Sequence, residues 1–114
     1  AKTVYRGLVR VNPKAVKLEG YQKNDTILLS ENAEADVVPN LEIENNDVKC
    51  SHGATISQID ESKLFYMMSR GIDEKSAKKQ IVEGFFDPIL VKIDNDVLKE
   101  NIKSSISERL GAIV

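Results

Sequence analysis

The side chains of this sequence that could bind a soft metal ion are its single cysteine, Cys50, and its single histidine, His52. They are separated only by a serine in the segment DVKCSHGAT, residues 47–55. In a β-strand, residues i and i+2 project from the same face, so a thiolate and an imidazole at this spacing could contact one metal ion or two irons of a cluster. Two other interpretations remain open: an inert buried cysteine beside a hydrogen-bonded histidine, and a nucleophilic Cys/His pair without an identifiable orienting residue.

The number of candidate ligands limits the kind of site. One cysteine and one histidine cannot supply the four nitrogen or sulfur ligands of a tetrahedral zinc site. The sequence also shows no Gly-rich phosphate loop, dinucleotide fingerprint or Ser/His/Asp set, and its carboxylates are scattered. We therefore expect a protein that is not an enzyme, and no complete soft-metal site within this one chain.

The amino-acid composition limits the binding partners and the cellular compartment that we expect. The 114 residues carry a net charge of -2, so no basic field attracts nucleic acid or anionic lipid. No apolar run approaches the roughly 20 residues that span a bilayer, and a lone cysteine forms no internal disulfide. We expect a cytoplasmic protein with neither nucleic acid nor membrane as a partner. Because the chain enters a strand pattern at once without an initiator methionine, we also expect a C-terminal fragment of a longer protein, with an unpaired first strand open to self-association.

The elements that position Cys50 and His52 are predicted to be strands. Short segments rich in Val, Ile, Leu and Thr alternate with turn signals up to Ile59. These signals are NPKA at residues 12–15, KND at residues 23–25, ENAEAD at residues 31–36 and NND at residues 45–47. Regular short strands indicate a stacked β-solenoid, whose coils bury their apolar faces against one another. A small antiparallel sandwich is the competing prediction.

After Ile59 the apolar periodicity is helical. Asp60 and Asp73 each stand where a helix N-cap is expected, and Gly71 stands where the first helix would stop. At helical spacing we expect Leu64, Phe65 and Met68 to be core residues. Pro88 should end or kink the second helix or open a new turn, and a third helix should begin near Asn95.

Three motifs within residues 28–72 resemble one family. They are P-x-L-E-I, then DVKCSHGAT, then ID-x-x-x-LFY-x-x-SRGI, in that order. The sequence is similar to the C-terminal core of the SufB/SufD family, components of the Suf iron-sulfur cluster assembly complex. The resemblance implies a mixed β then α fold: the last coils of a right-handed parallel β-helix in residues 1–59, followed by a C-terminal helical subdomain in residues 60–114.

The resemblance also implies a role. Members of the family are non-catalytic subunits that pair with a SufB-type subunit and dock the ATPase SufC through their helical region; a homodimer is the alternative pairing. His52, with Cys50, would contribute to a transient iron or iron-sulfur cluster site shared with the partner, and this chain alone would bind none stably. For the ATPase-docking surface we take Tyr66, Arg70, Gly71 and Ile72 as candidates.

Two positions distinguish the branches of the family. The SufB pattern has a cysteine where this chain has Asn24, and Glu-His-Glu where this chain has Ser51, His52 and Gly53. Both differences indicate a SufD-like chain. A SufB-like scaffold that binds the cluster itself, and a purely structural adaptor of the ATPase, remain the alternatives.

Overall fold

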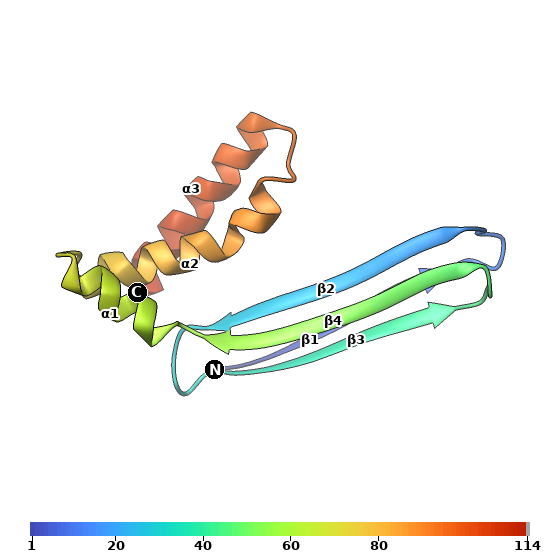
Figure 1. Cartoon of the computed structure of the whole chain (residues 1–114), viewed down its shortest axis with the longest axis horizontal. Coiled ribbons are helices and arrows are strands. Elements are labelled where there is room, and N and C mark those ends of the chain that lie inside the picture. Colours follow the sequence, from blue (N-terminus) through green and yellow to red (C-terminus); the bar gives the residue numbers. More distant parts are fainter. Residues whose placement is uncertain (114) are drawn as a thin grey trace. The chain divides into compact units, whose positions relative to one another are not determined.

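The computed structural model describes residues 1–113 and divides into two compact units. The first, Ala1–Gln58, contains four β-strands, and the second, which begins at Ile59, contains three α-helices (Figure 1). The predicted order of strands followed by helices is therefore confirmed. Among the residues described, no helix combines the length and the apolar character needed to cross a membrane.

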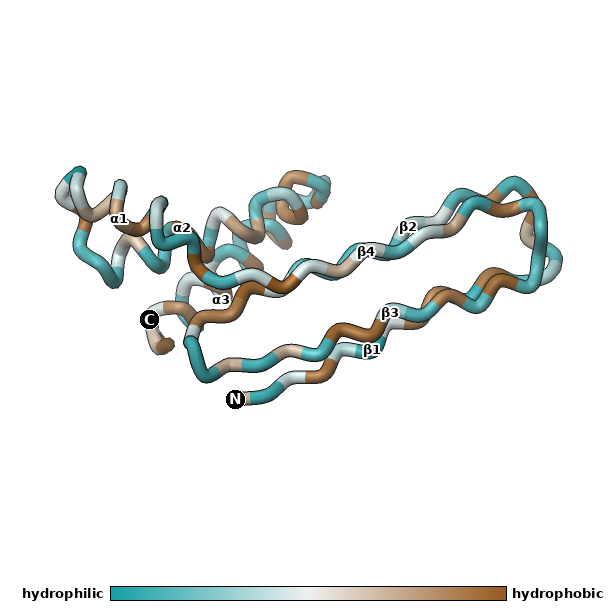
Figure 2. The backbone as a smooth tube through the Cα atoms, turned by 60° about the horizontal axis from the view of Figure 1, so that its bottom comes forward, coloured by the Kyte–Doolittle hydropathy of each residue, from teal (hydrophilic) through white to brown (hydrophobic). Residues whose placement is uncertain are grey.

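The strands of the first unit are long and pair in parallel. Strand β1 (Lys2–Val11) pairs with β3 (Glu34–Ile43), and β2 (Leu18–Leu28) pairs with β4 (Val48–Gln58). Each strand thus pairs with the next but one along the chain, and Figure 2 shows the two pairs as separate layers. The antiparallel sandwich is therefore wrong, whereas two stacked coils of a solenoid fit this pairing. The closed right-handed β-helix stays a prediction.

The segment KND, predicted as a turn, lies instead in the middle of β2. Its polar side chains are satisfied within the sheet, because Asn24 Oδ1 accepts a hydrogen bond from Thr26 Oγ1 at 2.9 Å and Asp25 accepts one from Thr55 Oγ1 at 2.6 Å. Asn and Asp favour turns because they bond to nearby backbone, and here other side chains take that place. The two short strands predicted on either side of KND consequently form one strand. The segment ENAEAD, also predicted as a turn, has its second half in a strand that begins at Glu34.

The two layers face each other through alternate residues of each strand. Gly7 and Val11 of β1 are buried, and Gln22 of β2 is half-buried. The Gln22 Nε2 atom lies so near the position of a Cβ on Gly7 that a side chain there would displace the Gln22 amide. We call these facing sides the inner faces; they comprise the odd-numbered residues of β1 and β3 and the even-numbered residues of β2 and β4.

The helices of the second unit begin at the predicted caps. Helix α1 (Glu61–Ser69) starts after Asp60, whose Oδ1 accepts hydrogen bonds from the backbone amides of Ser62 and Lys63. Helix α2 (Glu74–Leu90) starts after Asp73, whose carboxylate accepts from the Ser76 amide. Helix α3 (Asp96–Ile113) starts beside Asn95. The buried apolar side chains of the unit are Leu64, Ala77, Val82, Leu90 and Leu110.

Pro88 does not end α2, which continues to Leu90. A proline in a helix removes the hydrogen bond to the carbonyl four residues earlier, here that of Gly84. Pro88 lies in the last turn, and the amide of Val91 closes that turn by donating to the Asp87 carbonyl at 3.0 Å. The predictions that Pro88 ends the helix or opens a new turn were therefore wrong, because the loss of one bond so near the terminus is tolerated, whereas a kink at Pro88 stays a prediction.

Gly71 ends α1 by adopting a left-handed backbone, with φ of 92°. A side chain is strained at this φ, so Gly71→Ala should destabilise the protein by about 1–2 kcal/mol. Gly84, inside α2, provides the matched control, because a Cβ there meets nothing closer than 4.0 Å. Gly84→Ala should stabilise the protein by about 0.5–1 kcal/mol. Urea unfolding followed by circular dichroism at 222 nm measures both changes, and shifts of the same sign would contradict this account of Gly71.

The cap at Asp73 should make helix stability depend on pH. The backbone amide of Ser76 donates to this carboxylate and lowers its pKa from the ordinary value of 3.8. A lowered folded-state pKa gives stability that is present above the unfolded-state value and is lost as the pH falls through the folded-state value. Acid titration of the thermal midpoint should therefore show a smaller loss below about pH 4 in Asp73→Asn than in the wild type. Equal losses would show that the cap carboxylate does not contribute.

Candidate metal-binding site

The segment predicted to bind metal lies in β4 and has two different faces. Cys50 and His52 project from the inner face, as their spacing predicts, whereas Ser51 and Gly53 project from the outer face. Cys50 is half-buried, and His52 is exposed. The structure therefore places the thiol and the imidazole on one side of one strand.

Strand β2 supplies the neighbours of both residues. In the parallel register Gly20 lies opposite Cys50, and Gln22 lies opposite His52. Cys50 Sγ is 3.2 Å from the position that a Cβ on Gly20 would take, so a larger residue at this position would press on the sulfur. The glycine in β2 thus leaves room for the thiol, which sequence spacing did not reveal.

The outer face of β4 is fixed by contacts with β2. The Tyr21 hydroxyl lies 2.9 Å from the Cβ position of Gly53, so the glycine of the motif makes room for the tyrosine ring. Asp25 accepts a hydrogen bond from Thr55 and forms an ion pair with Lys23 at 2.7 Å. The bond from Lys23, and then that from Thr55, lowers the pKa of Asp25, and the same carboxylate raises the pKa of Lys23. The outer face therefore holds the two strands in register, while the inner face carries the candidate ligands.

Asn24, the residue that stands in place of the SufB-type cysteine, lies on the inner face of β2 opposite Ala54. It is therefore diagonal to His52 on the same surface. Its Oδ1 atom is already bonded to Thr26. A cysteine at this position would add a second thiol to that surface, whereas the asparagine offers only an amide.

The donor set on the inner face is incomplete for a metal ion. Within residues 1–113 no group of three or more His, Cys, Asp and Glu side chains lies close enough to hold a metal. A thiolate and an imidazole are nonetheless suited to iron or zinc. The two residues thus fit one side of a site that needs further ligands.

The four candidates for the docking surface have different environments. Tyr66 is 60% exposed, and the Arg70 guanidinium carbon lies 5.7 Å from the centre of its ring, within the range of a cation–π contact. Gly71 ends α1, and Ile72 is half-buried. The structure therefore brings Tyr66 and Arg70 together at the surface and gives Gly71 a structural role.

Two predicted core residues of α1 are instead exposed. Leu64 is buried, but Phe65 is 74% exposed and Met68 is 43% exposed. A short helix buries one stripe, and in α1 that stripe consists of Leu64 and the half-buried Met67. Phe65, Tyr66 and Met68 therefore form an exposed apolar surface that the core interpretation missed.

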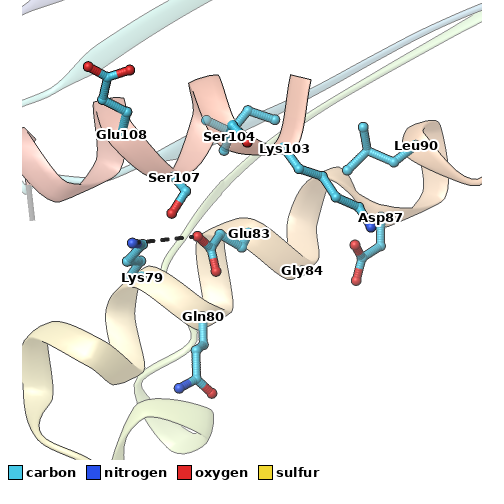
Figure 3. Close-up of a pocket in the computed structure, with 11 residues that line it drawn as sticks. Lys79, Gln80, Glu83, Gly84, Asp87, Leu90, Lys103, Ser104, Ser107 and Glu108 are labelled. Atoms are coloured by element: carbon cyan, nitrogen blue, oxygen red, sulfur yellow. Dashed lines mark ion pairs between the residues drawn. The ribbon is translucent and has the colours of Figure 1, made fainter. Parts of the chain in front are cut away.

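Figure 3 shows a groove between α2 and α3 that no sequence pattern predicted. Its volume is about 790 Å³. Lys79 and Glu83 of α2 lie 3.9 Å apart on its wall, and α3 contributes Lys103 and Glu108. Because its lining carries both signs of charge, the groove favours no single class of charged ligand.

Comparison with known proteins agrees with the motifs. Residues 1–85 match the family model described as SUF system FeS cluster assembly, SufBD core domain. The iron-sulfur cluster assembly protein SufD of Escherichia coli is 38% identical over 109 residues, which cover 96% of this chain and 26% of that protein. A SufBD family protein of Mycobacterium leprae is 36% identical over 111 residues, covering 96% of this chain and 28% of that protein.

A plant protein is also similar to this chain over most of the chain's length. Protein ABCI7, chloroplastic, of Arabidopsis thaliana is 35% identical over 105 residues, covering 92% of this chain and 22% of that protein. The chain thus spans about a quarter of the length of the curated relatives it matches. Because the family model covers most of its residues, the chain belongs to the SufBD core family of the SUF iron-sulfur cluster assembly system.

Proposed function

We propose that this chain acts in a SufD-like, non-catalytic subunit of a cytoplasmic Suf complex, pairs with a SufB-type subunit at a shared metal or cluster site, and docks the SufC ATPase. The observation that carries the proposal is the pair of soft donors on the inner face of β4, Cys50 and His52, which is too small to hold a metal ion alone. Membership of the SufBD family supports a role in cluster assembly. The amide at Asn24, in place of a SufB-type thiol, supports the SufD-like assignment.

A metal site whose ligands are divided between two proteins suits the transfer of a cluster. The cluster is then cargo and not a resident cofactor. An imidazole among thiolates changes the charge and the electronic properties of an iron-sulfur centre. In the proposed function, His52 supplies that imidazole and Cys50 supplies one thiolate, while the partner subunit supplies the other ligands. Separation of the two subunits would then remove part of the ligand set and release the cluster.

The shared site is tested by anaerobic reconstitution with iron and sulfide, followed by visible absorbance. We expect colour when this chain and a SufB-type partner are mixed, and little colour with this chain alone. His52→Ala should remove most of the colour that depends on this chain, because the imidazole is lost. Ser51→Ala is the matched control, since Ser51 is the adjacent exposed residue on the other face.

Each alternative function has its own outcome in this experiment. Colour in the isolated chain would replace the proposal with a SufB-like scaffold. If the visible absorbance is the same with and without this chain, the chain would be a purely structural adaptor of the ATPase. Colour that depends on the chain but survives His52→Ala would remove the imidazole from the shared site.

The docking surface is tested by pull-down with SufC. Arg70→Glu reverses the charge beside the exposed ring of Tyr66 and should reduce the recovery of SufC severalfold. Lys92→Glu, at an exposed position after α2, makes the same charge change and should leave recovery unchanged. Equal recovery from Arg70→Glu and wild type would move the docking surface away from α1.

A further inference from the structure

The side chain of Gln22 carries a polar atom with no partner. Its Oε1 atom is buried, and no residue between 1 and 113 donates a hydrogen bond to it. Buried carbonyl oxygens are nearly always bonded, and an exception usually marks an absent water, an absent ion or a functional role. This oxygen lies in β2 beside the candidate metal-binding residues.

The neighbouring polar residues of the inner face are satisfied differently. Asn24, the next inner-face residue of β2, accepts a hydrogen bond from Thr26. Gln22 has no such partner, although its amide end is held in a defined place. Its Nε2 atom lies close to the position that a Cβ on Gly7 would take. The Tyr5 hydroxyl lies 2.9 Å from that same position. The absence of a side chain on Gly7 thus makes room for the amide, whose oxygen has no donor among residues 1–113.

The residue opposite Gln22 can supply the missing donor. Gln22 and His52 are register partners, and adjacent strands lie about 4.8 Å apart, so the two side chains project from the inner face side by side. A histidine that binds metal through one ring nitrogen presents an N–H at the other, and that N–H is usually held by an oxygen acceptor. Gln22 Oε1 is a buried acceptor of this kind, without a competing bond.

We propose that Gln22 is a positioning residue for His52. Its carboxamide oxygen accepts the ring N–H of His52 when the other ring nitrogen holds a metal ion, which selects the tautomer and fixes the plane of the ring. The inference rests on the proposed role of His52 in metal handling. It adds a residue that makes no contact with the metal itself.

The test uses Zn²⁺ as the probe and the ¹⁵N-labelled chain mixed with an unlabelled SufB-type partner, because this chain alone does not complete the site. Because the chain has one histidine, its imidazole gives one set of ring signals in ¹H–¹⁵N NMR spectra. In the wild type, Zn²⁺ should shift these signals and produce a ring N–H proton that exchanges slowly with water. Gln22→Met removes the acceptor at similar size and should lower Zn²⁺ affinity by roughly tenfold or more, with loss of the slow proton.

Two further variants separate positioning from packing. Gln22→Glu keeps an oxygen acceptor and should retain the slow ring proton. Tyr5→Phe removes the other polar group near Gly7 and should change neither affinity nor exchange. Backbone ¹H–¹⁵N spectra without metal should match the wild type for each variant, which shows that the fold is intact.

Several results would overturn the proposal. Unchanged Zn²⁺ affinity in Gln22→Met would overturn it. A wild-type His52 imidazole that binds no Zn²⁺ at a millimolar concentration of the ion would overturn it as well. Weaker binding with the slow ring proton retained would make Gln22 a direct ligand instead. If Gln22→Met changes nothing while His52→Ala still blocks cluster formation with the partner, the inference fails and the proposed function stands.

Discussion

The parallel register between β2 and β4 is the constraint on which the rest of the site depends. It places Gly20 beside Cys50 and Gln22 beside His52, and it is held from the other side by the bond between Thr55 and Asp25. Because strand side chains alternate between faces, a slip of one residue would turn both candidate ligands to the opposite surface. A weak pair of donors therefore depends on an extended ladder of backbone hydrogen bonds.

The two units are stabilised to different degrees by apolar burial. Among the described residues, Val11 is the buried apolar side chain of the strand unit. The helical unit buries more of them, namely Leu64, Ala77, Val82, Leu90 and Leu110. Several apolar residues of the strands remain exposed, among them Val4, Leu8 and Ile56. Two isolated coils of a solenoid would show this exposure, because a solenoid gains its stability by adding neighbouring coils. In the strand unit, backbone pairing and polar contacts consequently carry more of the structure than a core does.

The helices and strands could be predicted from the sequence more completely than the contacts between their side chains. The spacing of Cys50 and His52 was sufficient to place them on one face, and the carboxylates at Asp60 and Asp73 were sufficient to place two helix starts. The turn at KND was wrong because Asp25 bonds to Thr55 of a strand that follows much later in the chain, while Asn24 bonds to Thr26 within its own strand. The exposure of Phe65 was missed because periodicity shows which residues share a stripe but not how wide a stripe the neighbouring helix covers. Gln22 could not have been identified, since its significance arises only from its register partner and from Gly7.

Strands β2 and β4 together have an outer face that anchors them to each other and an inner face that carries the candidate ligands, and this division has a consequence for how such a protein can change. Replacing an inner residue, such as Asn24 by cysteine, alters the ligands on offer without touching the bonds of Asp25 and Thr55 that set the register. The candidate ligands and the contacts that align the strands thus occupy alternating positions of β2 and β4. A substitution on the inner face therefore changes the side chains offered to a partner while the bond between Asp25 and Thr55 on the outer face is kept.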